Sequence, residues 1–132
     1  MSDIPDAVAA GPEREQLWGR RLDERKLEVC CIPFFIYGVA LGDIVEIDEN
    51  SVLANVVEKA GRYVFRVWLG ETVNPWREEV LEELSRLGCL TEFYSQNVIA
   101  VDAQDEPQAQ TLANLLAGFS SRGILEYETG RL

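Results

Sequence analysis

Histidine is missing from the sequence altogether, and only three cysteines occur among its 132 residues. The absence of histidine excludes Ser-His triads, histidine general bases and histidine-bearing metal sites. Cys30 and Cys31 are adjacent, so their side chains would point to opposite faces of a strand, and an odd count leaves one thiol unpaired. We therefore expect no disulfide framework and interpret all three cysteines as buried or strand-lining thiols.

Positive charge is also scarce, since 12 Lys and Arg residues face 23 Asp and Glu residues, for a net charge of −11. A nucleic acid would be repelled by such a surface, so we expect a basic protein as the partner and no nucleic-acid binding. The imbalance is greatest in the C-terminal half. From Glu71 onward the chain has eleven acidic residues and four arginines, so this part contributes −7 of the −11.

Long apolar runs are absent as well. No stretch approaches the roughly 20 apolar residues that cross a bilayer, and the first 16 residues have acids where a signal peptide has Lys or Arg. We therefore expect a soluble cytoplasmic protein with no membrane contact. With 47% hydrophobic residues, the chain is able to close one core, or two small subdomains that share an interface.

The N-terminal half is rich in extended segments. Residues 1–14 lack a hydrophobic period and are predicted to form a flexible tail. The stretch "SVLANVVEKAGRYVFRVWL" is predicted to be a hairpin that turns at Ala60-Gly61. Five extended segments joined by short turns predict a small SH3-like β-barrel over residues 15–62; they are residues 16–21, 26–32, 42–48 and the two halves of 51–69.

The periodicity becomes helical after Asn74. In "NPWREEVLEELSRLG", Asn74 is the predicted N-cap, Pro75 fits the first turn and Gly88 ends the helix in a left-handed conformation. Its apolar stripe consists of Trp76, Val80, Leu81, Leu84 and Leu87. Its acidic face consists of Glu78, Glu79, Glu82 and Glu83.

Two strands, "CLTEFYS" and "NVIAVDA", follow this helix. A second helix begins near residues 105–107, and "ILEYET" is the last strand. The apolar face of the second helix consists of Ala109, Leu112, Leu116 and Phe119. Counted from "YVFRVWL", the order βαββαβ predicts a ferredoxin-like plait over residues 63–132, with both helices on one face of a four-stranded antiparallel sheet. The fold class is therefore predicted to be α+β, with the barrel and the plait sharing one core.

The run "CIPFFIYGVALGDIVEID" is too apolar for a loop and too broken for a helix. One interpretation is structural: Gly38 and Gly42 supply bends, Asp43 bonds backbone N–H groups, and a plug closes the barrel end, formed by Pro33, Phe34, Phe35 and Tyr37. The other is an aromatic pocket with Tyr37 and Asp43 at its mouth.

The same run resembles the signature of a bacterial family of small proteins, the domain of unknown function 4265. Members of that family have a Pro-Phe-Phe-x-Tyr-Gly-x-Ala-x-Gly-Asp-x-Val pattern, which matches residues 33–45 here. The flanking stretches "LWGRRLDERKLEVCCIPF" and "YVFRVWL" are similar too. The resemblance covers most of the chain from about Gln16 and supports the fold boundaries, but it implies no reaction or catalytic residue.

The leading functional hypothesis is a non-catalytic, acidic protein-binding module. Glu78 with Glu82, and Glu79 with Glu83, are like-charge pairs that weakly destabilise a helix, and only Glu82 with Arg86 is favourable. A ridge retained despite this repulsion is typical of a surface that attracts a basic partner. In its most concrete form the hypothesis is an immunity or antitoxin-type inhibitor that occludes a basic toxin surface, with contacts from Glu78, Glu79, Glu82, Glu83, Trp76 and Tyr94.

Two alternatives remain open. A small-molecule sensor, often a dimer that pairs sheet edges, would hold its ligand at the junction of barrel and plait, near Tyr37, Asp43, Phe65 and Trp68. An enzyme using carboxylates or cysteine is disfavoured, because histidine is absent and the sequence contains no recognised catalytic motif. A charged strand end is preferred over a Mg²⁺ or Ca²⁺ site for Asp43, Glu46, Asp48 and Glu49, so we expect no metal and no cofactor.

Overall fold

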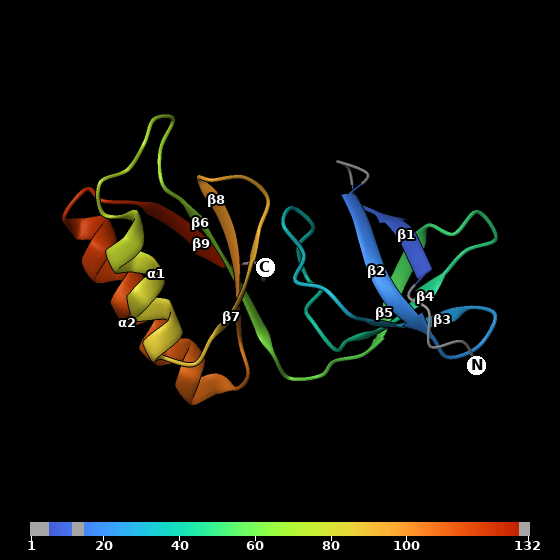
Figure 1. Cartoon of the computed structure of the whole chain (residues 1–132). Helices are drawn as coiled ribbons and strands as arrows, with labels where there is room; N and C mark the ends of the chain where they lie inside the picture. Colours follow the sequence, from blue (N-terminus) through green and yellow to red (C-terminus); the bar gives the residue numbers. More distant parts are fainter. Residues whose placement is uncertain (1–5, 12–14, 130–132) are drawn as a thin grey trace.

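The structure is a computed structural model that describes residues 6–11 and 15–129, and it contains two antiparallel sheets (Figure 1). The first sheet has the order β1-β2-β3-β4-β5, formed by β1 (Asp6–Ala10), β2 (Glu15–Arg21), β3 (Lys26–Val29), β4 (Ile44–Ile47) and β5 (Leu53–Glu58). The second has the order β7-β8-β6-β9, formed by β6 (Tyr63–Trp68), β7 (Leu90–Phe93), β8 (Val98–Ala103) and β9 (Glu126–Thr129). The prediction of an α+β fold is confirmed.

The first sheet curls into a half-barrel. Its two outer strands approach each other, because Ala9 and Val52 form a parallel bridge. Alternate residues of the strands point inward, as in β4, where Val45 and Ile47 are buried and Ile44 and Glu46 are partly exposed. The inward side chains form one apolar cluster that includes Val8, Leu17, Leu27, Val29, Val39, Val45 and Ile47.

Strand β1 corrects the prediction of a flexible tail over residues 1–14. Asp6–Ala10 pairs antiparallel with β2, and Val8 and Ala10 are buried in the half-barrel cluster. Because the side chains of Asp6–Ala10 are small, their alternation of apolar and polar residues is too weak to predict a strand without knowledge of β2 beside it. Residues 1–5 and 12–14 of the predicted tail lie outside the described residues.

The predicted hairpin at Ala60-Gly61 is wrong, because its two halves belong to different sheets. Gly61 has the expected positive φ of 85°, but the turn redirects the chain instead of reversing it. The Asp43 carboxylate accepts a hydrogen bond from the Ala60 N–H at 2.9 Å and so fixes this turn to the half-barrel. Strand β6 then pairs with β8 and β9.

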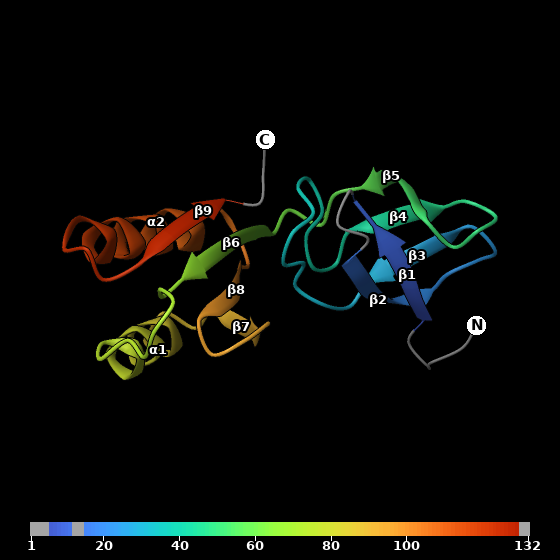
Figure 2. The ribbon, with the colours of Figure 1, turned by 90° about the horizontal axis from the view of Figure 1, so that it is seen from above.

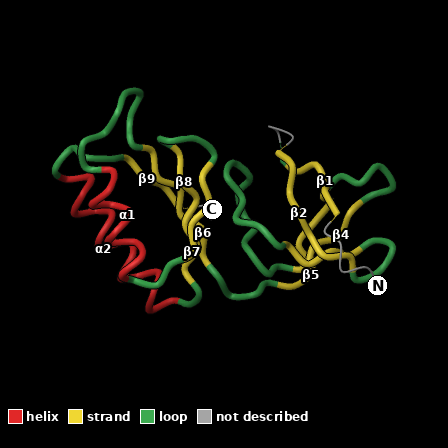
Figure 3. The backbone as a smooth tube through the Cα atoms, viewed as in Figure 1, coloured by secondary structure: helices red, strands yellow, loops and turns green. Residues whose placement is uncertain are grey.

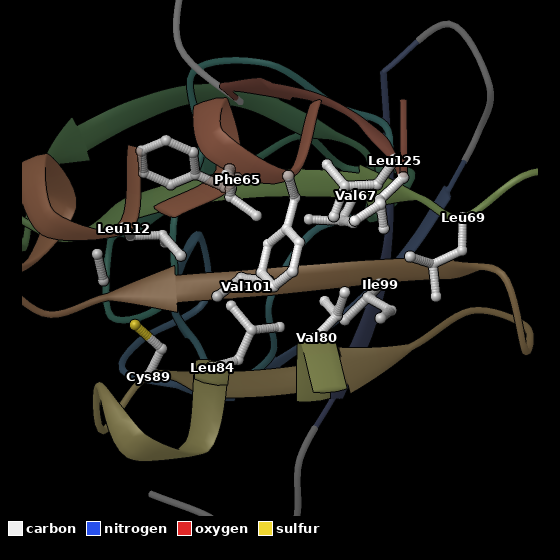
Figure 4. Packing of buried hydrophobic residues seen from close by; sticks show 14 of the residues in the cluster. Phe65, Val67, Leu69, Val80, Leu84, Cys89, Ile99, Val101, Leu112 and Leu125 are labelled. Carbon is white, nitrogen blue, oxygen red and sulfur yellow. The ribbon is translucent and has the colours of Figure 1, made fainter. Parts of the chain in front are cut away.

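Two helices, α1 (Arg77–Arg86) and α2 (Glu106–Ser121), cover one face of the second sheet (Figures 1 and 2). All four predicted residues of α2 are buried: Ala109, Leu112, Leu116 and Phe119. Of the stripe predicted for α1, Val80 and Leu84 are buried and Leu81 and Leu87 are partly buried, but the prediction is wrong for Trp76, which is 41% exposed. The buried helix residues belong to one cluster with the inward residues of the sheet, and Figure 4 shows Val80, Leu84 and Leu112 packing against Phe65, Val67, Ile99 and Val101. Within residues 6–11 and 15–129, no helix is long and apolar enough to span a bilayer.

The N-terminus of α1 differs from the prediction. The N-cap is Trp76 rather than Asn74, although Asn74 Oδ1 accepts the Trp76 N–H at 2.8 Å. Asn74 also donates through Nδ2 to the carbonyls of Leu69 and Ile124, at 2.9 and 2.8 Å, which ties the helix entry to the sheet ends. The Asn74 side chain is therefore used to bind carbonyls of other segments, and the residue precedes the helix instead of capping it.

The C-terminus of α1 matches the prediction in part. Gly88 has a positive φ of 79°, as expected after a helix C-terminus. Arg86, however, pairs with Glu83 rather than Glu82, since the i, i+3 neighbour is within reach on the same side of the helix. Arg77 Nη1 also lies 3.6 Å from Glu78 Oε1, so the acidic face is partly neutralised by arginines at both ends of its own helix.

Candidate functional site

Residues 30–43, here called the junction loop, run between the two sheets (Figures 1 and 3). Ile32 and Ala40 of this loop form a small apolar cluster with Val64 of β6 and Ala100 of β8, and Phe34 packs against it. Neighbouring residues on β6 and β8 pack against the helices, so this cluster lies on the opposite face of the second sheet. The loop therefore fills the space between the helix-free face of the second sheet and the half-barrel.

The junction loop plugs the half-barrel only in part. Val39 and Ile36 pack into the half-barrel cluster, and Pro33 is buried. Phe35 and Tyr37, in contrast, are 39% and 41% exposed. The prediction of an aromatic plug is thus wrong for these two side chains, because aliphatic residues of the loop already fill the core.

Three charged side chains from distant strands hold the loop backbone. The Glu15 carboxylate on β2 accepts the N–H groups of Phe34, Phe35 and Ile36, at 2.6, 2.9 and 2.8 Å. Glu92 on β7 accepts the N–H of Ile32. Arg66 on β6 donates to the carbonyls of Pro33, at 3.4 Å, and Ile36. Charge-assisted bonds to buried or partly buried backbone groups are strong, so the loop has a fixed conformation.

Asp43 is fully buried and binds backbone groups, as predicted. Its two oxygens accept the N–H groups of Ala40 and Ala60, both at 2.9 Å, and Lys59 Nζ lies 3.8 Å from Oδ2. This burial removes Asp43 from the mouth of an aromatic pocket, and the small cavity that it lines with Lys59 and Arg62 has no aromatic wall. Its role is to join the end of the junction loop to the turn that leads into the second sheet.

The other carboxylates near β4 do not converge on a common point. Glu46 accepts a hydrogen bond from the Asn55 side chain at 3.0 Å. Asp48 Oδ1 accepts the N–H groups of Asn50 and Val52, at 2.8 and 3.0 Å. In the part of the chain that the structure describes, no group of His, Cys, Asp or Glu side chains has the arrangement of a metal site.

An exposed aromatic cluster lies on the junction loop. The Tyr94 ring, from the turn after β7, packs with its centroid 5.4 Å from that of Phe34 and 4.9 Å from that of Phe35. Tyr94 is 61% exposed, although its ring contacts the rings of Phe34 and Phe35. We call Phe34, Phe35 and Tyr94, with the neighbouring exposed side chains Trp18 and Trp68, the aromatic junction surface. Phe93 faces the helix side, where the Arg77 guanidinium lies 5.4 Å from its ring centroid.

Two grooves flank this surface. One has a volume of about 270 Å³ and is lined by Phe35, Arg66, Trp68, Glu126 and Glu128; we call it the Trp68 groove. The other has a volume of about 320 Å³ and is lined by Glu15, Trp18, Cys31, Phe34, Glu92 and Phe93. Both therefore combine aromatic walls with carboxylates.

The predicted ligand-pocket residues do not all meet here. Trp68 lines the groove, and Tyr37 Oη donates a hydrogen bond to Glu128 Oε2 at 2.7 Å beside it. Phe65 is buried in the helix-side core (Figure 4), and Asp43 is buried elsewhere. Phe65 and Trp68 are three positions apart on one strand, so strand alternation already predicts that their side chains lie on opposite faces of the sheet. Arg66, which the sequence analysis missed, shares the face of Trp68.

Arg66 has the most unusual electrostatic environment of the junction. It is 6% exposed, and its guanidinium lies over the Tyr37 ring, 5.1 Å from the centroid. Burial lowers the pKa of Arg66, against the opposing influence of the Glu15 and Glu128 carboxylates. The hydrogen bond to the Glu128 carboxylate raises the pKa of Tyr37.

The predicted partner-binding residues fall on two surfaces. Glu78, Glu79 and Glu82 are exposed on α1, and Glu83 is partly exposed; together these four residues are the acidic ridge. Trp76 lies at the start of the same helix, with the Arg122 guanidinium 5.0 Å from its ring centroid. The helices cover the face of the second sheet that lies away from the half-barrel (Figure 2), whereas Tyr94 packs on the junction loop.

The cysteines differ in exposure. Cys89 is buried, Cys31 is partly buried and Cys30 is exposed just after β3, so the prediction of buried or strand-lining thiols is wrong for Cys30. Burial raises the pKa of Cys31 to about 11, although the Trp18 N–H, which donates to its Sγ at 3.3 Å, acts in the opposite direction. Burial also raises the pKa of Cys89. These two thiols are therefore protonated at neutral pH and are poor nucleophiles.

Comparison with known proteins gives a family and a fold. Residues 15–127 match the family model described as "Domain of unknown function (DUF4265)". No curated protein matches the chain. A crystal structure of a hypothetical protein from Neisseria gonorrhoeae is similar, with a TM-score of 0.74 and 19% sequence identity over 97% of this chain and 95% of that one. At this identity the likeness extends to the fold alone.

Proposed function

Because the chain belongs to the DUF4265 family, whose description assigns no function, we propose that it is a non-catalytic module that binds a basic protein. The observation that supports this proposal is the aromatic junction surface. Exposed aromatic side chains that adjoin one another are typical of contact sites, because Trp and Tyr supply much of the binding energy at protein interfaces. Here the Tyr94 ring packs against Phe34 and Phe35, and Trp68 and Trp18 line the two grooves that Phe34 also lines.

The rigidity of this surface favours binding. Phe34 and Phe35 belong to a loop whose backbone N–H groups are bound by Glu15. Binding to a surface that is already ordered loses less conformational entropy than binding to a mobile one. The aromatic anchors therefore need no rearrangement to meet a partner.

Charge determines the kind of partner. Glu126 and Glu128 line one groove beside the aromatic surface, and Glu15 and Glu92 line the other. With a net charge of −11 over the whole chain, a basic protein surface would be attracted from a distance. The most specific form of the proposal is an inhibitor that covers a basic, functionally important surface of a toxin-like protein in the cytoplasm.

The acidic ridge has a secondary role in this proposal. It lies on the helix side of the second sheet, apart from the aromatic junction surface. Its charges therefore attract the partner at long range, and the aromatic residues make the contacts. Such a division predicts that ridge charges affect the association rate, whereas the aromatic residues affect the dissociation rate.

The proposal includes finer descriptions of the two halves. The strand order β7-β8-β6-β9 with two helices on one face supports a ferredoxin-like plait. The five-stranded curled sheet supports an SH3-like half-barrel. The aromatic junction surface then lies where these two building blocks meet.

Affinity capture with matched variants tests the proposed function. The tagged protein is compared with a Phe35→Ala, Tyr94→Ala double variant and with Val57→Ala, which alters a residue of β5 that is 48% exposed. One stoichiometric basic partner retained by the wild type and by Val57→Ala, but lost by the double variant, is the expected result. A partner that the double variant retains would show that the contact lies elsewhere.

A further inference from the structure

One nitrogen of the buried Arg66 side chain has no hydrogen-bond acceptor. Nε and Nη2 donate to carbonyls of the junction loop, but among the described residues no acceptor lies within hydrogen-bonding distance of Nη1. The carboxylate of Glu128 forms a long ion pair with this nitrogen, with Oε1 3.9 Å away. A buried charged donor without an acceptor is costly, so this nitrogen is suited to bind an oxyanion.

The surroundings of Nη1 restrict the rest of the ligand. Arg66 lines the Trp68 groove together with the aromatic residues Phe35 and Trp68, which give the groove apolar surface. The volume of about 270 Å³ is slightly below the usual range for drug-sized ligands, which indicates a small molecule of one or two rings. Tyr37 Oη, at the edge of the same site, is a second donor aimed at a carboxylate oxygen.

Glu128 occupies the position that a ligand carboxylate would take. Its Oε2 accepts the Tyr37 hydroxyl at 2.7 Å, and its Oε1 faces Arg66 Nη1. Its side chain is 53% exposed, so it is able to swing into solvent. We propose that the Trp68 groove binds a small aromatic carboxylate, whose carboxylate replaces that of Glu128 between Arg66 Nη1 and Tyr37 Oη and whose ring packs on Phe35 and Trp68.

The carboxylates around Arg66 disfavour a dianion more than a monoanion. Glu126 and Glu128 line the groove, and Glu15 lies near the guanidinium, so a doubly charged phosphate would be repelled more strongly than a carboxylate. A planar carboxylate also matches the geometry of a guanidinium. A cation would be repelled next to Nη1, because this nitrogen belongs to the positively charged guanidinium of Arg66.

Titration with 2-naphthoate tests the proposal, and 2-naphthamide is the neutral control. Backbone amide shifts in the NMR spectrum of the full chain report the position, and isothermal calorimetry gives the affinity. We expect 2-naphthoate to shift amides of the junction loop, β6 and β9, and 2-naphthamide to bind about tenfold more weakly, as expected for the loss of a charge-assisted contact. Equal affinities for the two compounds, or no shifts at millimolar 2-naphthoate, would overturn the proposal.

Two charge-neutralising variants separate competition from general electrostatics. Glu128→Gln removes the internal competitor, whereas Glu126→Gln removes the same charge from the same groove without touching Tyr37 or Arg66. We expect Glu128→Gln to bind 2-naphthoate about tenfold more tightly than wild type, with a smaller gain for Glu126→Gln. Equal gains in both variants would contradict displacement of Glu128.

Tyr37→Phe provides a test that leaves Arg66 and the loop contacts in place. Its hydroxyl is exposed at the edge of the site, so the fold tolerates its removal. We expect this variant to bind 2-naphthoate about fivefold more weakly than wild type, because one hydrogen bond is lost. Unchanged binding would remove Tyr37 from the site. Ligand binding in the Trp68 groove needs no protein partner, so the result of these titrations does not depend on the proposed partner binding.

Discussion

Replacement of Asp43 by Asn tests the connection between the junction loop and the second sheet. In the wild type, Oδ2 accepts the Ala40 N–H and Oδ1 accepts the Ala60 N–H, both at 2.9 Å, in a side chain that is fully buried. An Asn side chain has one oxygen, so its amide NH₂ would face one of these N–H donors. Leaving a buried donor unsatisfied costs about 1–3 kcal/mol, and the remaining bond loses its charge assistance, so we expect a destabilisation of about 3 kcal/mol.

Asp48→Asn is the matched control for this substitution. Asp48 also caps a turn, but a single oxygen, Oδ1, accepts both of its N–H bonds, from Asn50 and Val52. An amide oxygen is able to keep both, so the expected loss is below about 1 kcal/mol. Urea unfolding followed by tryptophan fluorescence measures both variants. If Asp43→Asn destabilised the protein no more than Asp48→Asn, the reasoning about Asp43 would be refuted.

Three further outcomes follow from the structure. Leu112→Ala on α2, at a fully buried position, should lower the free energy of unfolding by about 2–5 kcal/mol in the same urea assay, and a loss below 1 kcal/mol would contradict the core packing. Iodoacetamide at mildly alkaline pH should modify the exposed Cys30 well before Cys31, whose pKa is raised to about 11, as peptide mass spectrometry would show; equal rates would contradict this environment. Glu128→Gln should lower the pKa of Tyr37 towards its usual value, because the acceptor of its hydrogen bond loses its charge. Phenolate titration measures this pKa, with Tyr37→Phe identifying the contribution of Tyr37, and the same Tyr37 pKa in Glu128→Gln as in wild type would argue against the hydrogen bond.

Local patterns predicted the elements of the second sheet well. Helix α2 buries the apolar face that the sequence indicates, and α1 buries the Val80 and Leu84 part of its predicted stripe but leaves Trp76 41% exposed. The strands around the helices follow in the predicted order. The failures concern strand pairing. The strand after Gly61 joins a sheet other than that of its predecessor, and Asp6–Ala10 becomes a strand because β2 is available beside it. Pairing depends on residues far away in the sequence, which a local pattern does not contain.

The candidate site shows the same limit. The aromatic character of the central run and the backbone bonds of Asp43 were predictable from residue types and turn chemistry. The side chains that hold the run were not, because Glu15, Glu92 and Arg66 come from positions 19 to 60 residues away from their partners. The error over Phe65 was avoidable, since strand alternation places it on the face opposite to Trp68.

The central claim is that a basic partner binds at the aromatic junction surface, and kinetic measurement of partner binding tests it most directly. The captured partner is bound to wild type, to Tyr94→Ala, and to a Glu79→Gln, Glu83→Gln variant of the acidic ridge. Removal of an aromatic anchor typically costs 2 kcal/mol or more, so Tyr94→Ala should weaken binding about thirtyfold, mainly through faster dissociation. The ridge variant should lower the association rate by a smaller factor. If Tyr94→Ala bound like wild type while the ridge variant lost the partner, the contact surface would be α1 and the account would be contradicted.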